Sequence, residues 1–174
     1  MKYLVKFIVV TFFLLICTHT FADEKIVILD LKYILNNSKA GNGAQDFLKK
    51  RFDDNVKKFA NMENELKKEE QDLLVKKTVL SKEEYVKKSD ELRKKVIDYR
   101  SQRRAAIDKI TTQRSESRAI LIKSIDPILL AYITENNISV VIKKANTLGG
   151  DPKNDITKII VEKLDKVLPS LDLK

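Results

Sequence analysis

The chain has few of the side chains that carry covalent or metal chemistry. Its 174 residues include no tryptophan, one cysteine and one histidine, and the last two both lie within residues 1–22. A mature chain that starts at residue 23 has no thiol nucleophile, no imidazole base, and no thiolate or imidazole ligand for a metal. It also has no disulfide, so packing or assembly must stabilise it. We therefore expect no enzymatic activity, no metal and no cofactor.

Helix-breaking residues are also scarce, and their positions are informative. The chain has four glycines and three prolines, yet none of them lies between Ala44 and Asp126. Glycine and proline destabilise a helix more than any other residue does. The stretch is therefore predicted to form one very long helix or the two arms of a helical hairpin.

The first 22 residues have the pattern of a secretory signal peptide. Lys2 and Lys6 precede an apolar run, and Thr20-Phe21-Ala22 places small residues at the positions that determine cleavage. We predict export, with cleavage after Ala22. A retained membrane anchor would need about 20 apolar residues, more than this run offers. A lipid-modified Cys17 would need a small residue before it, where the chain has isoleucine.

Ser81 and Glu84 favour a hairpin with its turn near residues 77–81. A serine followed three residues later by a glutamate forms a capping box, which marks a helix start. One straight helix would be about 125 Å long and would hold its two flanks far apart. Both flanks contain a short apolar run typical of a strand, Lys25–Leu29 and Ile138–Ile142. A turn lets the two strands share one core, and the first is expected to be buried on both faces.

Apolar residues recur every seven residues along both arms, as in a coiled coil. One column of the first arm is apolar throughout: Phe52, Phe59, Leu66, Leu73 and Leu80. Its companion column is mixed: Val56, Glu63, Glu70 and Lys77. The second arm also has two columns with seven-residue spacing, and together they form a mixed seam. One column contains Tyr85, Leu92, Tyr99 and Ala106, and the other contains Ser89, Val96, Arg103 and Ile110. We expect arms that pair loosely and leave grooves of half-covered apolar surface.

The segments that flank the hairpin predict a small body. Asp30 is expected to cap a short helix, residues 38–43 to form a loop, and Pro127 to begin a new or kinked helix. A last helix, capped by Asn154 or Asp155, is expected to have one apolar face: Ile156, Ile159, Ile160, Leu164 and Val167. The predicted fold is mainly α with a small β body: signal peptide 1–22, body 23–43 and 125–174, and hairpin 44–124. So small a body with open strand edges predicts a homo-oligomer.

Positive charge concentrates at the turn and on the returning arm. Residues 23–73 carry a net charge of −1, residues 74–118 carry +7, and residues 119–174 carry +1. We predict that this excess attracts acidic clients or an anionic membrane surface. The candidate residues for this binding are Lys76, Lys77, Lys82, Tyr85, Lys87, Lys88, Arg93, Lys94, Lys95, Arg100, Arg103 and Arg104. Nucleic acid is not expected as a partner, because the arm lacks interleaved aromatic residues and the chain is exported.

An apolar cluster lies among these charges at the turn. Its members are Leu74, Val75, Val79, Leu80, Tyr85 and Val86. Packing between the two arms of the hairpin is the simplest explanation for such a cluster. We therefore expect these side chains to be covered.

The order of these parts resembles the Skp (OmpH-like) family of periplasmic chaperones. The matching parts are Lys-Ile-Val-Ile-Leu-Asp near the start, a long Lys/Glu-rich middle, Ile-Ser-Val-Val-Ile, and Asp155-Ile156-Thr157 opening the last helix. The resemblance implies a homotrimer whose helical hairpins surround a cavity, with a core formed by Ile26, Val27, Ile28, Leu29, Ile138, Val140, Val141 and Ile142. It also implies an ATP-independent periplasmic holdase that keeps unfolded outer-membrane β-barrel proteins soluble.

Two other functions remain open at this stage. The basic coiled coil is also compatible with a structural tether that spaces envelope components. A third alternative, after the tether, is a peripheral protein that binds the membrane surface, with anionic lipid or lipopolysaccharide as partner. Suppression of client aggregation distinguishes the holdase from the tether, and vesicle co-sedimentation with a steep salt dependence would reveal the membrane-surface binder.

Overall fold

The structure is a computed structural model that describes residues 24–173. The predicted signal peptide, its cleavage site and Cys17 lie outside these residues. Within the described part, no helix is both long enough and apolar enough to span a membrane.

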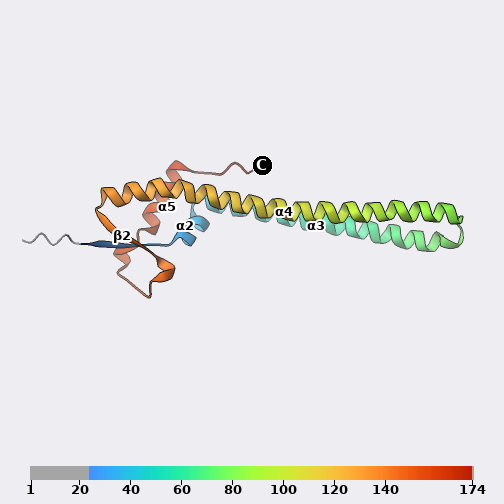
Figure 1. The fold of residues 1–174 in the computed structure, drawn as a ribbon, viewed down its shortest axis with the longest axis horizontal. Helices are drawn as coiled ribbons and strands as arrows, with labels where there is room; N and C mark the ends of the chain where they lie inside the picture. The colour runs from blue at the N-terminus through green and yellow to red at the C-terminus, as the bar shows by residue number, and fades with distance from the viewer. Residues whose placement is uncertain (1–23, 174) are drawn as a thin grey trace, which may run out of the picture.

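Two long helices dominate the molecule and are attached to a small body at one end (Figure 1). The chain forms β1 (Lys25–Leu29), α2 (Leu31–Asn37), α3 (Lys39–Val75) and the 3₁₀ turn η1 (Lys76–Thr78). It continues with α4 (Lys82–Glu135), β2 (Ile138–Lys143), the 3₁₀ turns η2 (Lys144–Asn146) and η3 (Pro152–Asn154), and α5 (Thr157–Val167). The predicted fold class, a helical hairpin on a small strand-and-helix body, is confirmed.

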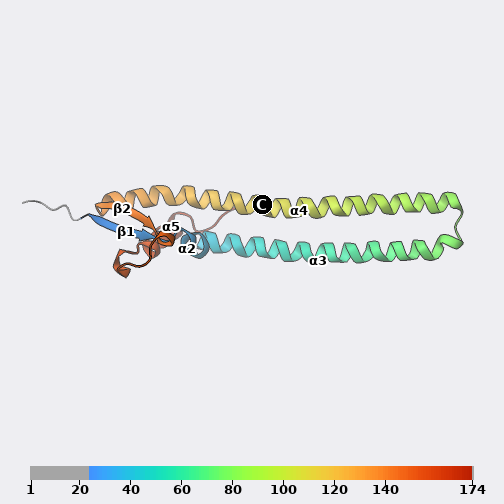
Figure 2. The same cartoon turned by 60° about the horizontal axis from the view of Figure 1, so that its bottom comes forward.

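The hairpin turn lies where the capping box predicts it. The Ser81 hydroxyl accepts a hydrogen bond from the Glu84 amide at 3.2 Å, and the Glu84 carboxylate accepts one from the Ser81 amide at 3.1 Å. Helices α3 and α4 then run side by side over the whole length of the hairpin (Figure 2). The return of α4 brings β2 next to β1, as predicted for two strands that share one core.

Residues 38–43 form no loop, so that prediction is wrong. Ser38 is the N-cap of α3: its hydroxyl accepts a hydrogen bond from the Gly41 amide at 3.2 Å. A Cβ on Gly41 would collide with the backbone carbonyl of Leu35. Glycine at this position therefore allows α2 to end directly against the start of α3, rather than breaking the helix.

Pro127 does not begin a new helix, which was one of the two outcomes predicted for it. Helix α4 continues through it to Glu135 and ends at Asn136. Pro127 is solvent-exposed, so water can satisfy the carbonyl group that loses its helical donor. Asn137 then adopts a positive φ of 51°, a conformation that asparagine tolerates well, and leads the chain into β2.

The two strands form a parallel sheet in which Ile26 pairs with Val140 and Val27 with Val141. The outer edge of β1 is partly covered, because the Ile156 amide donates a hydrogen bond to the Ile28 carbonyl at 3.0 Å. Burial of β1 on both faces is not observed in the single chain. Val27 is only 1% exposed, whereas Ile26 is 44% exposed.

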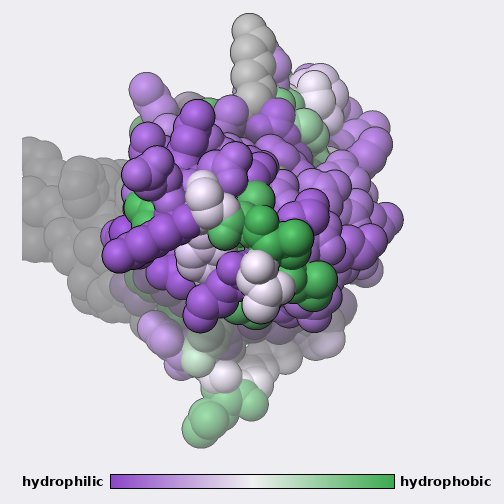
Figure 3. Space-filling view, turned by 90° about the vertical axis from the view of Figure 1, so that its right-hand side faces the viewer, coloured by the Kyte–Doolittle hydropathy of each residue, from purple (hydrophilic) through white to green (hydrophobic). Residues whose placement is uncertain are grey.

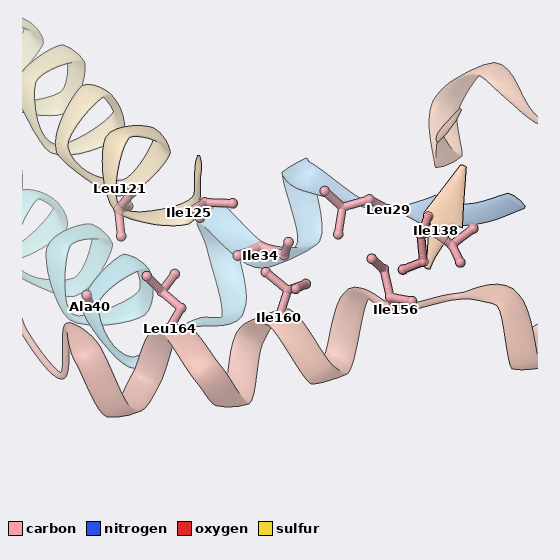
Figure 4. Packing of buried hydrophobic residues seen from close by; sticks show 10 residues of the cluster. Leu29, Ile34, Ala40, Leu121, Ile125, Ile138, Ile156, Ile160 and Leu164 are labelled. Carbon is pink, nitrogen blue, oxygen red and sulfur yellow. The ribbon is translucent and has the colours of Figure 1, made fainter. Parts of the chain in front are cut away.

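The core of the body gathers side chains from every major element (Figure 4). Ile34 of α2 and Ile160 of α5 are completely buried, and Ile125 of α4 is nearly so. Helix α5 presents a narrower apolar face than predicted, because Ile159 and Val167 are exposed. The Asp155 carboxylate accepts a hydrogen bond from the Thr157 amide at 3.0 Å, although Ile156 is the formal N-cap.

The seven-residue columns describe the seam of the hairpin only in part. Phe59, Tyr99 and Ile110 are buried between the arms as the columns predict. Phe52 belongs to the same column as Phe59, yet its side chain is 52% exposed. The arms therefore pair closely at some layers of the repeat and leave others open.

Candidate functional site

A groove of about 720 Å³ runs between the two arms in the distal half of the hairpin. Its apolar lining includes half-buried residues of the seam columns: Leu66, Leu73, Tyr85, Leu92 and Val96. Two exposed residues outside these columns, Leu74 and Ile97, also line it. Arg93, Arg100 and Arg103 of α4 also line it. The groove therefore combines an accessible apolar surface with a cationic rim.

A second groove of about 250 Å³ lies nearer the body. It shares Glu63, Tyr99 and Arg103 with the first groove, so the two adjoin. Phe52, Val56 and Ile107 are each about half exposed along it, at 52%, 53% and 51%. Together the two grooves, which we call the hairpin groove, offer a long surface that could hold an extended apolar chain.

A polar layer crosses the hairpin where the two grooves meet. The Tyr99 hydroxyl of α4 donates a hydrogen bond to the Glu63 carboxylate of α3 at 3.3 Å, and Lys67 pairs with the same carboxylate at 2.8 Å. These contacts, led by that with Lys67, hold the pKa of Glu63 below its ordinary value. The Tyr99 ring meets the Phe59 ring edge-on at 6.0 Å between centroids. Glu63 thus has a structural role at a position where the coiled-coil repeat calls for an apolar residue.

The structure divides the predicted binding residues into three groups. Tyr85, Arg93, Arg100 and Arg103 line the hairpin groove, and Arg104 lines a shallow hollow beside it. A second group surrounds the turn: Lys76, Lys77, Lys82, Lys87 and Lys88. The remaining two lie elsewhere along α4, where Lys94 is exposed and Lys95 is paired with Glu69 across the arms at 2.7 Å. The sequence prediction therefore merged two distinct surfaces, the groove and the turn.

Four exposed apolar residues were missing from the predicted site. Ile97 and Ile107 lie off both seven-residue columns of the second arm, and Ile97 is 58% exposed. An apolar residue outside the seam columns is not covered by the close packing of the seam, so this signal could have identified both of them. Phe52 and Val56 lie on seam columns, and no signal in the sequence indicated that they are exposed.

The eight predicted oligomerisation residues differ in their exposure, and only the exposed ones can contact another subunit. The core of the chain itself buries three of them: Val27, Leu29 and Ile138. The predicted oligomerisation surface is therefore limited to the other five residues. Ile26 and Val140 are exposed at 44% and 46%, and they are paired in register on neighbouring strands. The second edge of β2 is unpaired within residues 24–173.

The fold and these surfaces define a class of protein: a long helical hairpin, incompletely sealed along its seam, carried on a small strand-and-helix body. The family model for outer membrane protein (OmpH-like) matches residues 25–164. The chain therefore belongs to the OmpH-like family.

The fold is also similar to a solved structure. That structure is a protein of Caulobacter crescentus described as a candidate outer membrane chaperone (OmpH-like). The two chains are 16% identical and superpose with a TM-score of 0.80 over 90% of this chain and 93% of the other. Among curated proteins, no sequence matches this chain.

Proposed function

We propose that this protein is a periplasmic holdase chaperone that binds unfolded outer-membrane β-barrel proteins without using ATP. The hairpin groove is the observation that carries this proposal. Between residues 60 and 98 no residue of the described structure is buried, although the columns of the seam there are mainly apolar. A hairpin built only for rigidity would cover these side chains, because exposed apolar surface is costly in water.

The composition of the groove suits a client that must be held weakly and released. The apolar lining can cover hydrophobic side chains of an extended chain, and its open shape lets successive segments exchange. Arg93, Arg100 and Arg103 add long-range attraction for acidic segments, which speeds encounter more than it strengthens binding. No covalent or energy-consuming step is needed for this activity.

Assembly through the body belongs to the same proposal. Ile26 and Val140 form an exposed apolar pair on the sheet, next to the unpaired edge of β2. Family membership supports a homotrimer joined at this surface, with three hairpins around a common cavity. Such an arrangement would place several hairpin grooves around one client.

The test uses the chain that begins at Asp23, which retains every described residue. Multi-angle light scattering is measured for the protein alone and with a urea-unfolded outer-membrane protein diluted into buffer. The expected result is a trimer alone and a soluble complex of one trimer with one client. A protein that leaves the client to precipitate would contradict the proposal and favour the envelope tether.

A pair of charge-matched variants shows whether the groove captures the client. Arg100→Gln with Arg103→Gln should slow client association and reduce its salt dependence. Lys109→Gln with Lys123→Gln removes the same charge from exposed sites on α4 that do not line this groove, and should have less effect. Equal rates for the two double variants would rule out the groove as the site of electrostatic capture.

A further inference from the structure

The two ends of the hairpin differ in how their apolar residues are covered. At the turn, four members of the apolar cluster are exposed, contrary to the expectation from sequence: Leu74 at 58%, Val75 at 77%, Val79 at 82% and Val86 at 51%. Viewed end-on, hydrophobic residues form a patch surrounded by hydrophilic ones (Figure 3). Within residues 24–173 each arm has only the other arm beside it there, because the body lies at the far end (Figure 2). The base of the hairpin has additional cover.

One covering element at the base is the segment that follows α5. Helix α5 ends at Val167, and residues 168–173 then run back along the first part of the hairpin (Figures 1 and 2). They contain no helix or strand, yet Leu168 and Leu171 pack against the core of the body. These residues lie beyond the part of the chain, 25–164, that the family model matches. Family membership therefore does not account for this segment.

The exposure of successive residues shows that one side of this segment faces the protein. Leu171 and Leu173 are half-buried, whereas Asp172 between them is exposed. This alternation is that of an extended chain lying with one face on a surface. The core cluster against which Leu171 packs includes Leu121 and Ile125 of α4. The segment therefore links α5 to the core at the base of α4.

A hydrogen bond attaches the last turn of α5 to the other arm. The Asp165 carboxylate accepts a hydrogen bond from the Lys39 amide at 2.7 Å. Lys39 is the first residue of α3, and its amide is one of those that a helix leaves without an internal acceptor. The Leu168 amide donates to the Leu164 carbonyl at 2.7 Å, which connects the segment directly to this turn of α5. Asp165 and the segment together thus contact the bases of both arms.

Contacts at the base have a large effect at the turn, because the hairpin is a long lever. Its first arm, α3, has 37 residues. Arms of about 55 Å would move the turn by roughly 10 Å for a rotation of about 10° at the body. A few side chains that limit this rotation therefore decide how far the hairpin can move.

We propose that residues 168–173 form a strap that, together with Asp165, restricts the swing of the hairpin about the body. Half-buried leucines hold the strap, and it has no helix or strand of its own, so it can detach while the body stays folded. Detachment frees the hairpin to swing over a wider angle. This inference concerns the chain alone and does not rest on the proposed chaperone function.

The chain that begins at Asp23 contains no cysteine, so two introduced cysteines can carry spin labels. Lys153→Cys labels the body in η3, and Lys68→Cys labels α3, both at exposed positions. Labelled chains are refolded with an excess of unlabelled chain, so that distances within one chain dominate. Double electron–electron resonance then measures the distribution of the distance between body and hairpin. A chain that ends at Leu168 should give a distribution wider by roughly 5 Å.

A substitution tests the strap without removing it. Leu171→Ala should widen the distribution in the same direction as the truncation, but less. Leu148→Ala is the matched control, because Leu148 is the same residue type in a loop of the body and is fully exposed. It should leave the distribution unchanged. Equal widening by both substitutions would assign the effect to general loosening of the body and refute the strap.

The contact with α3 is tested in the same way. Asp165→Ala removes the acceptor of the Lys39 amide and should widen the distribution. Glu162→Ala removes an exposed carboxylate from the same helix and should not. If the two variants behave alike, Asp165 does not take part in the strap.

Two further results would overturn the proposal. An unchanged distribution in both the truncated chain and Leu171→Ala would show that the segment does not restrain the hairpin. Circular dichroism and light scattering report whether the truncated chain keeps its helix content and its oligomeric state. Loss of the folded body on truncation would make the segment an essential part of the core, not a strap that can detach.

Discussion

The body and the hairpin of this molecule use their apolar residues in opposite ways. In the body, short elements from both ends of the chain enclose one core, and Ile34, Ile160 and Leu164 are fully buried. In the hairpin, two long helices meet along one seam, and most of their apolar residues remain partly exposed. A helix in the body is covered from several sides, whereas each arm of the hairpin has only one neighbour.

This difference explains how one chain can be stable and still offer binding surface. Burying an apolar side chain contributes roughly 25 cal/mol for each Å² removed from water. The body uses that energy to hold its fold, while the hairpin leaves part of it available to a bound molecule. Helical propensity and the capping box maintain the arms where packing does not.

The largest expected effect of a substitution is in the body. Ile160→Ala removes a completely buried side chain and should lower the free energy of unfolding by about 2–5 kcal/mol. Ile159→Ala is the matched control, because Ile159 is the adjacent residue of the same type and is 39% exposed. Its cost should be below about 1 kcal/mol. Urea unfolding followed by circular dichroism measures both, and equal costs would contradict the contrast between core and surface on α5.

Local features of the sequence predicted most of the fold. The strands, the Asp30 cap and the capping box at Ser81 depend on neighbouring residues only, and each is confirmed. The loop predicted at residues 38–43 failed because a glycine that breaks a helix and a glycine that permits close packing look alike in sequence. Only the position of the Leu35 carbonyl distinguishes them.

The candidate site was predicted less completely than the fold, for a physical reason. A seven-residue repeat gives the direction in which a side chain points along the helix but not the distance to the partner arm at each layer. Phe52 and Phe59 are therefore equivalent in the repeat, and yet one is exposed and the other is buried. Net charge can be counted from the sequence alone, and this count identified the cationic arm. It could not separate the arginines of the groove from the lysines at the turn.

The junction between body and hairpin should show an intermediate effect. Gly41→Ala would force a Cβ into the Leu35 carbonyl at the place where α2 meets α3, and should destabilise the protein by about 1–3 kcal/mol. Gly43→Ala is the matched control, because a Cβ there meets nothing within 4 Å and the residue lies within the same helix.

The two alanine variants should change the stability of the protein in opposite directions, and their thermal unfolding temperatures measure this. Gly43→Ala should stabilise the protein by about 0.5–1 kcal/mol, since alanine is the better helix former. Destabilisation by both variants would mean that the first turns of α3 require glycine for flexibility rather than for packing.

The smallest expected effect lies in the hairpin, at the polar layer. Tyr99→Phe keeps the ring packed near Phe59 but removes the hydroxyl that donates to Glu63 at 3.3 Å. Because Lys67 remains as the main stabilising partner, the pKa of Glu63 should rise toward its ordinary value and stay below it. NMR titration of the glutamate side-chain carbons measures this change directly, and Tyr85→Phe in the same groove serves as the control.

The sign of the pH dependence follows from the lowered pKa of Glu63. A carboxylate whose pKa is depressed in the folded state stabilises the fold at neutral pH, and that contribution is lost as the pH falls through its folded pKa. The stability difference between the parent chain and Tyr99→Phe should therefore shrink on acidification. A difference that stays constant with pH would show that the Tyr99 hydroxyl stabilises the hairpin independently of the charge on Glu63. No difference at any pH would show that Tyr99 acts through its ring alone, which would make the seam more like the apolar core of the body.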